Sequence, residues 1–203
     1  MKGGCGQPFF KTAIAEVGEF CQISCGSCPC CEVLLAAAAK IGGGEFAWAF
    51  NATDPSLRVE AAPLMQPGFM ATVLVPPDGA MRAAIDRLGG RGAIASDARA
   101  RGELTKIVAA HILRPNAEYN APWTSPFLKR AVGSVLPTFA DGVSLKVVSA
   151  DDKGGVAFAP VLANGDAGGA SSSSARMAAG GSGRLDLEAC KGTVVGVDQV
   201  IVP

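Results

Sequence analysis

The spacing of apolar residues changes from a helical period to a strand period near Val135 of the 203-residue chain. Before this point apolar side chains mostly recur three and four positions apart, and after it they alternate with polar ones. A run of helices followed by a run of strands is typical of α+β domains, in which the two kinds of element are largely segregated. We therefore expect an α+β fold.

Helices are predicted where this spacing is limited by a capping or breaking residue. Asp78 is expected to cap the helix that follows a buried strand at 71–75, and Ser125 to cap another helix. The most regular apolar stripe includes His111 and ends before Pro115. The apolar positions of the predicted helices are Val33, Leu34, Ala37, Ala38 and Ile41; Phe46, Ala49 and Phe50; Met81, Ala84, Ile85 and Leu88; Leu104, Ile107, Val108, His111 and Ile112; and Phe127, Leu128 and Ala131.

Strands are predicted where apolar and polar residues alternate, or where short apolar runs lie between turn residues. A stretch rich in Gly, Ala and Ser, 164–183, interrupts them. It has too few apolar side chains to offset the entropy cost of ordering it, so we expect a disordered insertion in the sheet. The predicted strand segments are 143–147, 156–162, one beginning at 185, 193–197 and 200–202.

The cysteines gather at the N-terminal end, and they divide the chain into a cysteine-rich segment, 1–31, and a domain, 32–203. Disulfides, a thiolate site for zinc or copper, and a redox pair formed by Cys25 and Cys28 are the competing interpretations. The tight spacing and the single histidine favour disulfides over a metal site. An odd number of cysteines leaves one thiol free or paired with another chain. The candidates are Cys5, Cys21, Cys25, Cys28, Cys30, Cys31 and Cys190.

Charge and hydropathy narrow the classes of function. The formal net charge is +0, which argues against a nucleic-acid binder. Between Arg82 and Arg114 basic residues outnumber acidic ones, and we interpret this as a solvated helix surface, with binding of acidic polysaccharide as the alternative. The sequence contains no run long enough to span a membrane and no apolar core of a signal peptide at its start, so an extracellular chain would be a mature segment.

Four blocks of the chain, in order, resemble the fasciclin-like adhesion domain: a helical pair, the segment 72–81, the segment 104–113 and a β-rich end at 186–203. In the second block an apolar strand is followed by prolines, the acidic Asp78 and a helix, and the third block carries His111. The resemblance covers about residues 31–203. It implies N-terminal helices packed on a C-terminal β-sheet wedge. The family usually has Tyr where this chain has Ala110.

The resemblance also implies a function. A fasciclin-like domain would be a non-enzymatic adhesion or matrix-organising module, extracellular or at the cell surface, that needs no cofactor and binds matrix or cell-wall proteins or polysaccharides. The cysteine cluster and the insertion suit the algal or plant type, and 20–28 is similar to the end of a sea-anemone-toxin-like module. Because the chain ends lie close together in this family, Cys190 is expected to pair with Cys31 or Cys30.

Few other residues carry a chemical signal. Asn51 begins an Asn-Ala-Thr sequon, and together with the cysteines this indicates a glycosylated surface protein. His111 lies on an apolar stripe, so we interpret it as a core histidine bonded to the backbone. No catalytic motif is recognised, and a hydrolase using His111 as base would need a nucleophile beside its ring. The alternative function is a cysteine-cluster protein that binds zinc or copper.

Overall fold

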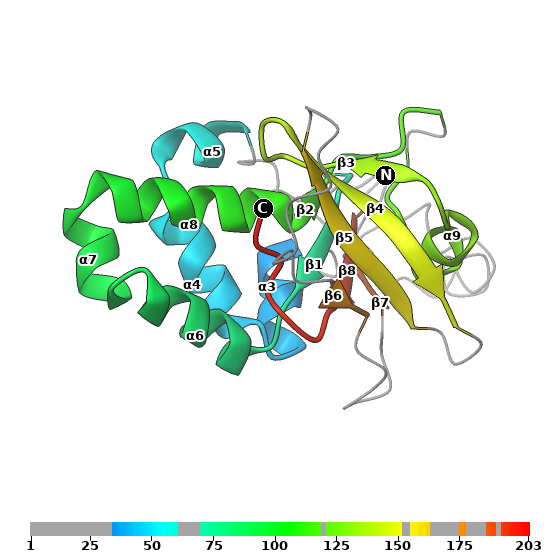
Figure 1. Ribbon diagram of the computed structural model, residues 1–203. Coiled ribbons are helices and arrows are strands. Elements are labelled where there is room, and N and C mark those ends of the chain that lie inside the picture. The colour runs from blue at the N-terminus through cyan, green and yellow to red at the C-terminus, as the bar shows by residue number, and fades with distance from the viewer. Residues whose placement is uncertain are drawn as a thin grey trace, which may run out of the picture.

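The computed structural model describes residues 34–60, 70–118, 121–151, 155–162, 175–177, 186–189 and 192–203. Within these ranges the fold is α+β, as predicted (Figure 1). The helices are α3 (Leu34–Lys40), α4 (Gly44–Ala52), α5 (Pro55–Glu60), α6 (Asp78–Arg87), α7 (Gly90–Ser96), α8 (Ala98–Ala110) and α9 (Ser125–Arg130). The strands are β1 (Thr72–Val75), β2 (Ile112–Leu113), β3 (Val135–Pro137), β4 (Val143–Ala150), β5 (Val156–Leu162), β6 (Ala175–Arg176), β7 (Asp186–Ala189) and β8 (Gly192–Gly196).

The described strands form two four-stranded sheets, with orders β2-β1-β8-β7 and β3-β4-β5-β6. The second sheet is an antiparallel meander, whereas in the first β1 and β8 run parallel with Val73 opposite Val194. Bridges between Leu113 and Thr138, and between Met177 and Val197, connect the two sheets. Figure 1 shows α4 to α8 gathered at one end, the meander at the other, and β1 and β8 between them.

The core is built mainly from apolar side chains of β1 and of the helices and strands that cover it. All four residues of β1 are buried, as expected for a strand covered on both faces. Phe46 and Phe50 of α4 and Phe158 of β5 are among the largest fully buried side chains. Gly43 lies where α3, β1 and α4 meet, and a Cβ there would overlap Val75 Cγ1. Only glycine permits this close approach of the chain segments.

Several predicted element limits are wrong by a few residues. The stripe helix ends at Ala110, so His111 and Ile112 lie beyond it, because Ile112 pairs with Val73 of β1. Thr124, not Ser125, occupies the N-cap position of α9. Helix α7 was not predicted from the sequence. The glycines after α6 indicated only a helix end, whereas α7 begins at the second of them, Gly90.

The expected disordered insertion, 164–183, is wrong in one part. Within it, Ala175 and Arg176 form β6 and pair with Phe158 and Ala157 of β5. Ala175 and Met177 are 0% and 2% exposed, so these apolar side chains join the core. Nothing in the sequence distinguishes this short strand from the Gly-, Ala- and Ser-rich residues around it. The rest of 164–183 lies outside the described residues.

Candidate functional site

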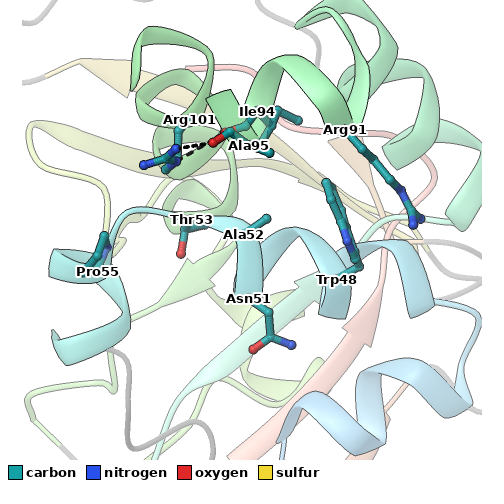
Figure 2. A pocket seen from close by; sticks show the side chains of 9 residues that line it. All are labelled: Trp48, Asn51, Ala52, Thr53, Pro55, Arg91, Ile94, Ala95 and Arg101. Atoms are coloured by element: carbon teal, nitrogen blue, oxygen red, sulfur yellow. Dashed lines mark hydrogen bonds between the residues drawn. The ribbon is translucent and has the colours of Figure 1, made fainter. Parts of the chain in front are cut away.

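Helices α4, α7 and α8 and the start of α5 enclose a hollow of about 290 Å³ (Figure 2). Its size is close to the lower limit for small-molecule sites, about 300 Å³. The lining combines one indole, two guanidinium groups, one amide and several small or apolar side chains, and none of its members carries a carboxylate. The lining residues are Trp48, Asn51, Ala52, Thr53, Pro55, Arg91, Ile94, Ala95 and Arg101.

One wall of the hollow is a stacked pair formed by Trp48 and Arg91. The Arg91 guanidinium carbon lies 4.4 Å from the centroid of the Trp48 ring, a cation–π distance. Arg91 Nη2 donates to Glu45 Oε2 at 2.6 Å, and Arg82 Nη2 donates to Glu45 Oε1 at 3.1 Å. The hydrogen bond from Arg91, followed by that from Arg82, lowers the pKa of Glu45 against the opposing effect of burial. An ionised Glu45 therefore holds Arg91 in place over the indole.

Arg101 of α8 forms the opposite wall. Its Nε donates to Ile94 O at 3.2 Å and its Nη2 donates to Ala95 O at 2.7 Å (Figure 2). These carbonyls belong to the last turn of α7, where carbonyl groups lack helical partners, so a cation is favoured there. In the described part of the chain Arg101 forms no ion pair. Two of its five N–H groups hold it in place, and no carboxylate of a described residue pairs with it.

The sequon residue Asn51 lies at the end of α4, on the edge of the hollow. Its side chain is exposed, and Nδ2 donates to Ala47 O at 3.1 Å. Thr53 of the same sequon is 1% exposed, and its hydroxyl donates to Phe50 O at 2.7 Å. The sequence indicated a modification site here and did not indicate the hollow, because Trp48, Arg91 and Arg101 come from three separate helices.

His111 lies at the C-cap of α8 and is 0% exposed. Its Nδ1 is 2.7 Å from Ile107 O, and Ile201 N donates to Nε2 at 3.0 Å. Because a carbonyl only accepts, the proton is on Nδ1 and the ring is neutral. Burial lowers the pKa of His111 from 6.5 to about 4, partly opposed by the bond to Ile107. Both ring nitrogens are bonded to backbone, so neither is placed to act as a general base.

Asp78 has a different role from the one predicted. It is the first residue of α6, whose N-cap position is Pro77, and it makes no cap bond to its own helix. Its Oδ1 instead accepts from Glu45 N, in the first turn of α4, at 2.8 Å. The carboxylate thus accepts the hydrogen bond that an N-cap side chain would normally accept, but for α4, which lies earlier in the sequence.

The basic residues between Arg82 and Arg114 are dispersed. Arg82 and Arg91 share Glu45, and Lys106 pairs with Glu103 at 3.1 Å. The guanidinium carbon of Arg114 lies 4.4 Å above the Phe139 ring, close to the meander. Only Arg91 and Arg101 of this set line the hollow.

All seven cysteines, Cys5, Cys21, Cys25, Cys28, Cys30, Cys31 and Cys190, lie outside the described residues. Among the residues that are described, no group of three or more His, Cys, Asp or Glu side chains is arranged to hold a metal ion. No helix in the described ranges is long and apolar enough to cross a membrane.

Of the comparisons with known proteins, only the comparison with solved structures gives a match. No family model matches the chain, and no curated protein matches it. Among solved structures, the chain is similar to a FAS1 domain pair from the insect cell adhesion molecule Fasciclin I, with 14% sequence identity and a TM-score of 0.47. The match covers 81% of this chain and 47% of the other, so this chain spans about half the length of the chain it matches.

Proposed function

We propose that this chain is a fasciclin-like domain that acts as a non-enzymatic adhesion or matrix-organising module, outside the cell or at its surface. Its partners would be matrix or cell-wall proteins or polysaccharides. The proposal starts from the sequence blocks that resemble the family: the strand and helix at 72–81, the stripe that carries His111 at 104–113, and the closing segment at 186–203.

The observation that carries the proposal is that these three blocks meet in space. β1 pairs with β8 of the closing segment and with β2 of the stripe block. His111 O accepts from Leu74 N of β1 at 2.8 Å, and its ring accepts from Ile201 N of the closing segment. Segments recognised separately in the sequence thus form one hydrogen-bonded centre, as expected if they were parts of the same family fold.

Further features of the proposal concern the cysteine-rich segment and Asn51. We propose that the cysteine-rich segment, 1–31, is disulfide-bonded, that Asn51 carries a glycan, and that the domain is of the algal or plant type. The exposed position of Asn51 supports the second of these points. Disulfides and an N-glycan are both features of secreted and cell-surface proteins.

A binding experiment tests the proposed function. The full oxidised chain would be applied to immobilised matrix proteins and to neutral and acidic cell-wall polysaccharides, with the reduced and denatured chain as control. We expect saturable binding to at least one of these surfaces by the native chain only. Absence of binding to all of them would contradict an adhesion function.

The alternative function, a zinc or copper protein, is favoured only by the cysteine cluster. Elemental analysis of natively purified protein separates the two functions. A stoichiometric metal that is lost when the N-terminal cysteines are changed to serine, together with no matrix binding, would replace our proposal. A metal-free protein with paired cysteines supports it.

A further inference from the structure

We propose that the hollow between α4, α7 and α8 is a binding site for a carboxylate-bearing sugar unit, such as a uronate of an acidic polysaccharide. This inference rests on the proposed function, because it names the ligand class through which an adhesion module of this kind would attach. It concerns residues that the family resemblance does not mark: Trp48, Arg91 and Arg101.

The charge of the hollow selects an anion. Arg91 and Arg101 line it, and none of the lining residues in the described part of the chain carries a carboxylate. Glu45, which contacts the Arg91 wall, is shared between two arginines, Arg91 and Arg82. The charged side chains among the described lining residues are thus two arginines, although the chain as a whole has a net charge of +0. A local excess of this kind attracts anionic ligands.

The arginine geometry favours a carboxylate held by two parallel bonds. Arg101 is fixed by the carbonyls of Ile94 and Ala95, which occupy Nε and one hydrogen of Nη2. The other N–H groups of its planar guanidinium can donate to both oxygens of a carboxylate. Since the backbone already fixes this side chain, little rotamer entropy is lost when a ligand binds.

The indole favours a sugar ring as the carrier of that carboxylate. One face of the Trp48 ring is covered by Arg91 at 4.4 Å. In the view of Figure 2 the ring stands between Arg91 and the other lining residues, so its second face is directed to the hollow. The C–H face of a pyranose can pack flat on an aromatic ring while its hydroxyl groups stay in contact with water. A flexible acidic side chain of a protein offers no comparable flat apolar surface.

The experiment uses the full chain made in the bacterial periplasm, where disulfides form and Asn51 remains unmodified. Tetragalacturonate is titrated into the protein, and its methyl ester, in which each carboxylate is converted into an uncharged methyl ester on the same sugar backbone, serves as the ligand control. A sulfated oligosaccharide and a tetraglutamate peptide distinguish other anions. Arg101→Gln is compared with Arg99→Gln, a change of an exposed arginine on the same helix that is not part of the lining.

We expect tetragalacturonate to bind more tightly than its methyl ester, and Arg101→Gln but not Arg99→Gln to weaken binding about tenfold. Binding should weaken as salt is raised, because the arginines are near the surface. In NMR spectra of the wild type, the indole N–H signal of Trp48 should shift on titration and that of Trp123 should not. This readout needs no variant and holds even if Arg101→Gln does not fold.

Three outcomes would overturn the inference. They are equal binding of the ester, equal effects of the two arginine changes, and shifts confined to residues away from the hollow. Preference for the sulfated sugar or for tetraglutamate would also contradict it and would assign the hollow to another anion. If the chain adheres to matrix surfaces but does not bind tetragalacturonate, the inference fails and the proposed function stands. If neither binds, both fail.

Discussion

At the scale of single residues, His111 connects three parts of the chain through one ring and one carbonyl. The ring bonds to Ile107 O and Ile201 N, and the carbonyl accepts from Leu74 N. Phe46 packs nearby, with ring centroids 5.8 Å apart. A buried ring with both nitrogens satisfied stabilises the native state, because removing it leaves backbone groups without partners and opens a cavity.

We expect His111→Ala to lower the free energy of unfolding by about 2–4 kcal/mol, through the lost hydrogen bonds and the cavity. Denaturant titration at neutral pH measures this change. An unfolding midpoint equal to that of the wild type would contradict the structural role of the ring.

The lowered pKa of His111 predicts a pH dependence of stability. The unfolded ring has a pKa near 6.5 and the folded ring one of about 4, so between these values the unfolded state binds more protons. The stabilisation is complete above about pH 6.5 and is lost as pH falls towards 4, by about 3 kcal/mol in total. Thermal unfolding of the wild type and of His111→Gln across this range isolates the effect, because the variant has no titrating ring. Parallel pH profiles of the two proteins would contradict the prediction.

At the scale of elements, the side chain and backbone of one residue, Asp78, connect α6 to α4 and to the loop before it. Asp78 follows β1 after two prolines and bonds to the first turn of α4, so the strand, the prolines and two helices form one unit. Asp78 N in turn donates to Gly42 O at 3.2 Å, in the loop between α3 and α4. The acidic position in this motif therefore joins two helices instead of starting only one.

Asp78→Ala should destabilise the protein by about 0.5–2 kcal/mol, the usual effect of removing an N-cap acceptor. Asp78→Asn keeps an oxygen that can accept from Glu45 N and should recover most of the loss. The two variants are compared by denaturant unfolding. Equal losses in the alanine and asparagine variants would show that the hydrogen bond to α4 is not the source of the effect.

At the scale of the whole molecule, segments far apart in the sequence close the two sheets into one core. β6 adds a fourth strand to the meander, and the bridge from Met177 to Val197 connects it to the chain after β8. Arg176 N also donates to Asp198 Oδ1 at 2.7 Å. These contacts lie within a stretch that the composition alone assigned to an unstructured insertion.

The insertion should therefore divide into a dispensable and an indispensable part. Shortening 164–174 should have little effect on stability, since loop closure entropy changes by only about 0.6 kcal/mol per doubling of length. Met177→Ala should cost about 2–5 kcal/mol, because this side chain is buried. Arg176→Ala, at the exposed position just before Met177 in the chain, is the matched control. A near-neutral Met177→Ala would show that the residue after β6 does not contribute to the folded core.

A disulfide between Cys190 and Cys31, or else Cys30, remains a prediction for the residues outside the described part. One contact between described residues is consistent with it: a Cβ at Gly192, two residues after Cys190, would lie 2.7 Å from Cδ2 of Leu34, three residues after Cys31. Such a long loop gives a stabilisation of up to about 4–5 kcal/mol. Peptide mapping without reduction should recover the cross-linked peptide. Recovery of Cys190 as an alkylated free thiol would contradict the pairing.

The sequence by itself determined what depends on local spacing. The apolar period predicted the helices around Phe46, Met81 and Leu104 and the strands β4 and β5, because the side chains of one face recur at fixed intervals whatever they pack against. It also indicated that His111 belongs to the core. Helix ends were less accurate: the stripe continues through Ile112, and only pairing with β1 ends the helix at Ala110.

Only the tertiary structure decided the features that depend on distant partners. The parallel pairing of β1 with β8, the cap that Asp78 provides to α4, and the burial of Met177 each join segments with no common local signal. The hollow belongs to the same class, because Trp48, Arg91 and Arg101 are spread over α4, α7 and α8. A periodic pattern shows which face of an element is buried, but the neighbour on that face is selected by the packing of the complete chain.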